Sequence, residues 1–130
     1  MTTTPPPLVP ALTAPGGPLA PLGIPVASRV RHPRPTSAIR VIALGGAPTA
    51  DYALSAPSAL IECWAEDPDA AYLLATQAWQ LLRATQGTEI SPGLWVQDAR
   101  LTLPVDNPDT QSKSPRWQFI FTPIVAQEET

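Results

Sequence analysis

The sequence predicts an α+β domain: a small, mostly antiparallel sheet of four to five strands with one main helix packed on a face, preceded by a Pro-rich N-terminal arm. Two observations favour this class. Short stretches rich in β-branched and aromatic residues are separated by Pro and Gly, as in strands joined by turns. One longer stretch repeats apolar residues at helical steps. A chain of 130 residues has room for one domain and not for two ordinary ones.

The arm is expected to occupy residues 1–25. Proline lacks an amide donor and fixes φ, so the prolines at positions 5, 6, 7, 10, 15, 18, 21 and 25 exclude a long helix or a central strand. Leucines between these prolines are too apolar for a fully solvated tail. We therefore expect short helical turns that open at Pro10 and Pro18, lying across the domain or a neighbour.

Residues 26–125 are expected to form the domain and residues 126–130 a frayed end. The strand pattern is strongest in the last strand, where Trp117, Phe119 and Phe121 alternate and should face the core. In 38–44 the alternation gives one buried face and one mixed face, with Arg40 and Ile42 on the mixed one. The expected strands are 24–31, 38–44, 58–65, 93–103 and 115–125, separated by a turn at 32–36, a loop at 47–57, the helix, and a polar loop at 104–115.

The main helix is predicted over residues 68–85. Asp67 has the side chain of an N-cap, and Pro68 suits the first helical position. Gly87 is well placed to stop the helix.

The charge pattern argues against broad binding to nucleic acid or membrane. The net charge is −3 and only 15% of the residues are charged, so few phosphates could be neutralised. The exception is a basic cluster, which is either a solvated strand end and turn or a contact for an anionic group on a partner or on nucleic acid passing nearby. The cluster consists of Arg29, Arg31, His32 and Arg34, with Arg40 beyond it. The sequence has no apolar run of 18 residues and no signal segment with a basic start and an uninterrupted apolar stretch. We therefore expect the protein to function in a cytoplasm or in an assembly that forms there.

The residues offer no convincing catalytic chemistry. Cys63 is the only cysteine and lies in an apolar run, so it should behave as a small buried hydrophobe. Its one conceivable partner, His32, lies in a charged, Pro-flanked segment. Glu62 and Glu66 make a weak acid–base pair, and Glu62 is expected on a solvated or interfacial side of its strand.

Cofactor and metal signals are equally weak. Neither a phosphate-binding Walker loop nor a dinucleotide fingerprint is present. The carboxylates of Asp51, Asp106 and Asp109 lack the spacing of a calcium loop. We therefore predict no enzyme activity, no cofactor and no metal.

A set of short motifs in a fixed order points to a family. The motifs are Val30-Arg31-His32-Pro33-Arg34-Pro35, Ile39-Arg40-Val41, Gly45-Gly46, Leu60-Ile61-Glu62-Cys63-Trp64-Ala65, the Ala-rich helix 68–85, and Pro115-Arg116-Trp117-Gln118-Phe119. Their order and spacing over about residues 26–125 resemble those of tail terminator proteins of long-tailed, siphovirus-type bacteriophages, especially those of actinobacterial hosts. The arm departs from that family, whose members usually open with a regular helix.

The resemblance implies a virion structural protein assembled in the host cytoplasm. Such proteins form a ring, typically a homo-hexamer, on the head-proximal end of the tail tube. The ring ends growth of the tube, and it docks to the head connector or stopper protein. The implied partners are thus further copies of the chain, the major tail tube protein and the connector, with phage DNA passing through the lumen without sequence-specific contact.

Two segments are the expected contacts of such a ring, the 29–36 turn and the 104–115 loop. Their polar side chains are the interface candidates: Arg29, Arg31, Arg34, Asp106, Asn107, Asp109 and Lys113. The alternatives are another head–tail connector or minor tail protein, a non-viral cytoplasmic binding module, and a small enzyme.

Overall fold

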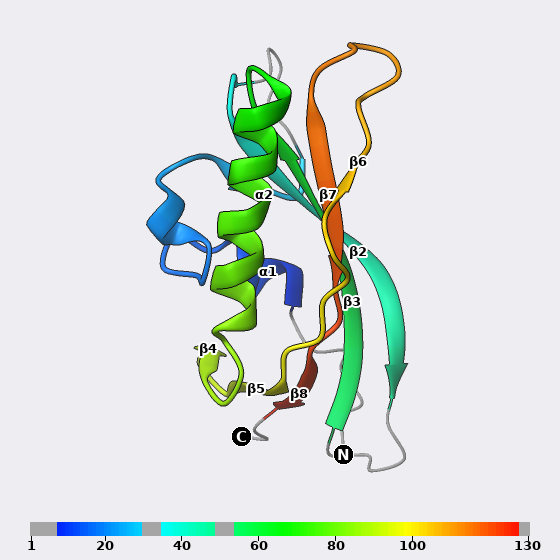
Figure 1. Cartoon of the computed structure of the whole chain (residues 1–130). Helices are drawn as coiled ribbons and strands as arrows, with labels where there is room; N and C mark the ends of the chain where they lie inside the picture. The colour runs from blue at the N-terminus through cyan, green and yellow to red at the C-terminus, as the bar shows by residue number, and fades with distance from the viewer. Residues whose placement is uncertain (1–7, 30–34, 49–53, 128–130) are drawn as a thin grey trace.

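The computed structural model describes residues 8–29, 35–48 and 54–127, and Figure 1 shows their arrangement. One main helix, α2 (Pro68–Arg83), packs against a curled sheet, so the broad α+β prediction is confirmed. The sheet has eight strands among the described residues, more than the four to five predicted. The only parallel pair in this part of the chain is β1–β2.

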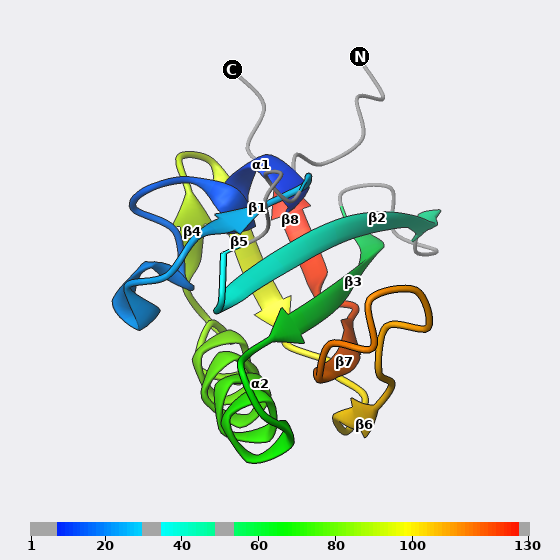
Figure 2. The same ribbon diagram turned by 90° about the horizontal axis from the view of Figure 1, so that it is seen from above.

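The sheet branches at its longest central strand. β3 (Leu54–Trp64) pairs with β2 (Ala38–Pro48) along one edge. Its other edge pairs first with β8 (Ile124–Gln127) and then with β7 (Arg116–Phe121). One branch continues through β8 to β5 (Leu94–Asp98) and β4 (Glu89–Ser91), and the other through β7 to β6 (Val105–Asp106). Figure 2 shows β4–β5 and β6–β7 at opposite ends of the curled sheet.

The first two strands differ from the prediction. Of the predicted strand 24–31, the structure describes residues 24–29, and among these β1 (Val26–Ala27) is the part that pairs in register, with Ile39 and Arg40 of β2. The predicted loop 47–57 is largely strand, since β2 runs to Pro48 and β3 begins at Leu54. The glycine pair forms a bulge between Ala43 and Gly45, with φ of 84° at Gly45, and the strand continues past it.

The last strands are also divided differently. The predicted strand 93–103 begins with a hairpin, in which Gly93 adopts a φ of 79° between β4 and β5, and the strand ends at Asp98. The predicted strand 115–125 is two strands. Pro123 lies between them, and β7 and β8 pair with successive parts of β3.

The helix begins where the sequence predicts. The Asp67 carboxylate accepts a hydrogen bond of 2.7 Å from the amide of Ala70, and Pro68 is the first helical residue. The helix ends at Arg83, earlier than predicted. Gly87 lies in the turn that follows, with φ of 77°, and its amide donates to the carbonyl of Val96 at 2.7 Å.

The core lies between α2 and one face of the sheet. Phe119 and Phe121 are buried as predicted, and Trp117 packs against the core from its edge. Cys63 is fully buried, which confirms its interpretation as a small core residue. The sheet residues of the core are Ile39, Val41, Ala59, Ile61, Cys63, Phe119 and Phe121, and α2 contributes Ala71, Leu74, Ala75, Ala78 and Leu82.

The arm lies across the domain. It forms α1 (Leu8–Thr13) and a 3-10 turn, η1 (Ala20–Leu22), and buries Leu8, Leu12 and Leu19 in the core. Position 17 has room only for a glycine, because a Cβ atom there would lie 2.5 Å from the carbonyl oxygen of Ala11. The two helical segments begin at Leu8 and Ala20, which are close to the predicted starts at Pro10 and Pro18 but not at them.

Candidate functional site

The most unusual polar feature is a buried carboxylate held by two arginines. Glu62 lies in the middle of β3, and its side chain is only 4% exposed. Arg40 of β2 donates from Nε to Glu62 Oε1 at 2.5 Å, and Arg116 Nη1 of β7 lies 3.1 Å from Oε2. Of the two sides expected for Glu62, solvated or interfacial, the solvated one is wrong, because side chains from both neighbouring strands cover the carboxylate.

Trp64 completes this cluster. The guanidinium carbons of Arg40 and Arg116 lie 5.4 Å and 5.5 Å from the centroid of its ring, within the range of cation–π attraction. Two guanidinium groups and one carboxylate leave one positive charge in excess. We call Arg40, Glu62, Trp64 and Arg116 the ion cluster. It ties three strands together at the end of the sheet where β7 begins.

The ion cluster also anchors the hairpin that joins β6 to β7. Arg116 Nε donates to the carbonyl oxygen of Asn107 at 2.8 Å, and the Asn107 amide donates to the carbonyl of Arg116 at 2.9 Å. Figure 1 shows this hairpin at the same end of the molecule as the first turn of α2. A single side chain thus links the base of the hairpin to a buried charge.

The tip of the hairpin is an ordered turn around Asp109. Its carboxylate accepts hydrogen bonds from the Ser112 hydroxyl at 2.8 Å and the Gln111 amide at 3.1 Å. These bonds, that of Ser112 first, lower the pKa of Asp109. Lys113 has a positive φ of 58°, and its amide donates to the Asp109 carbonyl at 2.7 Å. The predicted 104–115 loop is therefore a hairpin built on specific bonds.

The predicted interface residues divide into two groups. Asp106, Asn107, Asp109 and Lys113 come together in the β6–β7 hairpin, as their closeness in sequence requires. Arg29 is exposed and follows β1, on the far side of β2, β3 and β7 from that hairpin. Arg31 and Arg34 lie outside the described residues.

The second face of the sheet forms an open surface. Residues in register lie on the same face of a sheet, and the row Ile42, Leu60 and Ile120 crosses β2, β3 and β7 on the face opposite the core. All three are partly exposed. Val105 extends the next row onto β6 and is 57% exposed.

We call Ile42, Leu60, Val105 and Ile120 the open face. Among the described residues, the helices pack on the other side of these strands. The sequence already places Ile42 on a mixed face of its strand. What sequence reasoning missed is that the same mixed face continues on the neighbouring strands.

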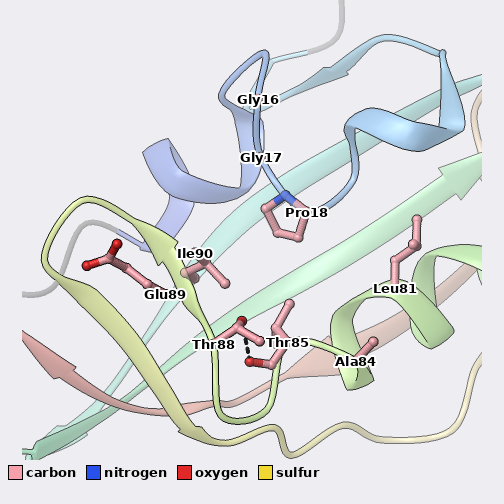
Figure 3. A pocket seen from close by; sticks show the side chains of 9 residues that line it. All are labelled: Gly16, Gly17, Pro18, Leu81, Ala84, Thr85, Thr88, Glu89 and Ile90. Carbon is pink, nitrogen blue, oxygen red and sulfur yellow. Dashed lines mark hydrogen bonds between the residues drawn. The ribbon is translucent and has the colours of Figure 1, made fainter.

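An open depression lies elsewhere, between the arm and the end of α2 (Figure 3). It is open and holds about 250 Å³. The Thr85 hydroxyl donates to the carbonyl of Leu82, and the Thr88 hydroxyl donates to the carbonyl of Thr85, both at 2.6 Å. Both hydroxyl protons are therefore used in hydrogen bonds within the turn that follows α2. The lining residues are Gly16, Gly17, Pro18, Leu81, Ala84, Thr85, Thr88, Glu89 and Ile90.

Reactive and metal-binding groups are sparse in the described part of the chain. Burial raises the pKa of Cys63 to about 12, with a smaller contribution from the nearby charge of Glu62. The thiol is therefore protonated at neutral pH. Residues 8–29, 35–48 and 54–127 contain no group of three or more His, Cys, Asp or Glu side chains that could hold a metal ion.

The helices of the described residues are all too short or too polar to cross a membrane. Known protein families give no match to this chain. A search of curated proteins likewise finds no significant match. The interpretation of the surfaces therefore depends on the geometry and on the ordered sequence motifs.

Proposed function

We propose that this protein is a virion structural protein that forms a ring, of six copies, on the head-proximal end of a phage tail tube. The ring ends growth of the tube and presents the surface to which the head connector docks. Its place is the head–tail junction of the virion, after assembly in the host cytoplasm. The proposal is supported by the ordered motifs of residues 26–125 and by the surfaces described above.

The observation that carries the proposal is the anchored β6–β7 hairpin. Its base is bonded through Arg116 to a buried carboxylate, and its tip is closed around Asp109. A loop that is ordered before binding loses less conformational entropy when it docks. Such a hairpin is suited to repeated docking on the tube or the connector.

The mechanism in this proposal is geometric. A head-to-tail interface between identical subunits closes into a ring when its rotation fits, and a closed ring has no free end at which to grow. No bond is made or broken. The end of the tube is thereby replaced by a surface of different shape, which the next tube subunit does not recognise and the connector does.

Arg29, Arg31 and Arg34 are proposed to contact an acidic group of a neighbour or to face the DNA in the lumen. Replacing all three with Ala should lengthen tails or impair head joining. Normal tail length together with normal head joining would reject this role.

The ring itself is tested by light scattering coupled to size exclusion over a wide concentration range, with negative-stain images of each peak. We expect six-fold rings, either from the protein alone or after addition of the tube protein of the same phage. A compact dimer that forms no rings under either condition would reject the proposal and favour a host binding module. Rings found elsewhere in the particle would indicate a different connector or minor tail protein.

A further inference from the structure

We propose that the open face of one copy binds the outward side of α2 of a second copy, and that this contact joins neighbouring subunits. This inference rests on the proposed self-assembly and specifies its interface. Because α2 covers the core face of the sheet, its outward side and the open face point in opposite directions. A contact between them is therefore head-to-tail, the kind that closes into a ring when its rotation fits and forms an open filament when it does not.

Charged groups of opposite sign border the two surfaces. Beside the open face, Arg40 is paired with Glu62 and is 35% exposed, while the charge of Arg116 acts on both Glu62 and Asp109. The start of α2 carries Glu66, Asp67 and Asp69, all exposed, and the helix has no basic residue before Arg83. The positive end of the helix dipole offsets only about half a charge. The acidic helix start of one copy can thus meet the exposed part of Arg40 on the next.

The apolar groups are complementary as well. On the outward side of α2, Leu73 is 57% exposed, and at the edge of that side Tyr72 is 50% exposed while its ring packs edge-to-face on Trp117 of β7, with the centroids 4.8 Å apart. On the sheet, Ile42, Leu60 and Ile120 form the partly exposed row, and Val105 stands beside it. These are aliphatic and aromatic side chains that lose contact with water when a helix packs on a sheet.

The spacing of charge and apolar groups agrees on the two surfaces. Along β2, Ile42 lies two residues after Arg40, which is about 6.8 Å at the usual rise of an antiparallel strand. Along α2, Asp69 and Leu73 are separated by one helical turn, about 6 Å. Leu73 can therefore lie on the apolar row while Asp69 reaches Arg40.

The decisive experiment mixes two blocked variants. Leu73→Arg blocks the helix side and Leu60→Arg blocks the open face, while Pro92→Arg adds the same charge at the exposed turn between β4 and β5, off both surfaces. Each blocked variant alone should be a monomer by light scattering, of mass 13.8 kDa in the unmodified chain. Mixed in equal amounts, they regain one intact interface and should form a dimer that does not grow. Pro92→Arg should assemble as the wild type does.

A second variant guards against misfolding. Leu60 is partly buried, so Val105→Arg, at a more exposed position, replaces Leu60→Arg if circular dichroism reports loss of structure. For weak association, the double variant Leu60→Cys, Leu73→Cys should give a ladder of disulfide-linked oligomers on oxidation, whereas either single variant should stop at dimers. Cys63 is buried and does not contribute in the folded chain.

The outcomes separate this inference from the proposed function. Wild-type rings that persist in both blocked variants would overturn the interface and leave the ring intact. A mixture that stays monomeric, or a double-cysteine variant that forms no ladder, would also overturn the interface. If the wild-type protein forms no ring, alone or on tubes, while the double-cysteine variant gives the ladder, the capping function is rejected and the head-to-tail contact is retained.

Discussion

Replacing Glu62 with Gln tests whether the ion cluster stabilises the fold. The carboxylate is 4% exposed and holds Arg40 at 2.5 Å and Arg116 at 3.1 Å. The amide keeps the shape but not the charge, and its NH₂ group must face one of the two guanidinium groups. Removing one partner of a buried ion pair costs about 3–5 kcal/mol. Since the Arg40 side chain is 35% exposed and regains some hydration, we expect about 3 kcal/mol.

The free energy of unfolding is measured by urea denaturation at pH 7, together with the thermal midpoint. With an unfolding entropy of about 2.1 cal/mol/K per residue, a loss of about 3 kcal/mol lowers the midpoint of a chain this long by roughly 11 °C. Glu66→Gln, an exposed neighbour on the same segment, is the matched control and should change stability by less than about 0.5 kcal/mol. A loss below about 1 kcal/mol for Glu62→Gln would refute the reasoning, because both arginines would then be satisfied without the carboxylate.

Three further perturbations follow from single contacts. Asp67→Ala removes the cap on Ala70 and should cost about 1 kcal/mol in urea unfolding, whereas Asp67→Ser should restore most of it. The folded pKa of Asp109 lies below its ordinary value, so the carboxylate stabilises the turn fully at any pH above that ordinary value. This stabilisation is lost as the pH falls through the lowered pKa, and the NMR chemical shift of the Gln111 amide should follow the loss. A transition of that shift at the ordinary pKa would contradict the prediction. Deletion of residues 106–113 should leave a folded protein by circular dichroism that caps tubes poorly, and normal tail lengths would count against the hairpin as a docking element.

Local signals were sufficient for the elements whose causes lie within a few residues. The α2 N-terminus follows from Asp67 and Pro68, whose side chains act on the first turn itself. The alternation of Phe119 and Phe121 likewise gives the buried face of β7 directly. In each case the stabilising partner is either adjacent in the chain or is simply the core.

The ends of the strands could not be predicted in this way, because a strand extends only as far as a neighbouring strand pairs with it. Strand-forming side chains extend over the predicted strand 24–31, yet among its described residues, 24–29, only Val26 and Ala27 pair in register with β2. Residues 54–57 belong to the predicted loop 47–57, but β2 and β8 supply their pairing and make them the start of β3. Pairing between distant segments overrides local preference here.

The candidate site was hidden for the same reason. Glu62 is a charged residue in an apolar strand, which usually indicates a solvated face. Its burial depends on Arg40 and Arg116, which come from different strands and meet it only in the folded sheet. The excess of one arginine over the carboxylate is likewise a property of the register of β2, β3 and β7 and not of any one segment.

Arg116 connects the two surfaces on which the proposed assembly depends. Its Nη1 lies against Glu62 beside the open face, and its Nε bonds to the Asn107 carbonyl at the base of the hairpin. The direction of the hairpin is therefore fixed relative to the face that is proposed to bind the neighbour. In a closed ring every subunit has the same surroundings, so hairpins fixed in this way all project from the same side. A set of identical, pre-ordered hairpins on one side is what lets a ring present one surface to the tube and a different one to the connector.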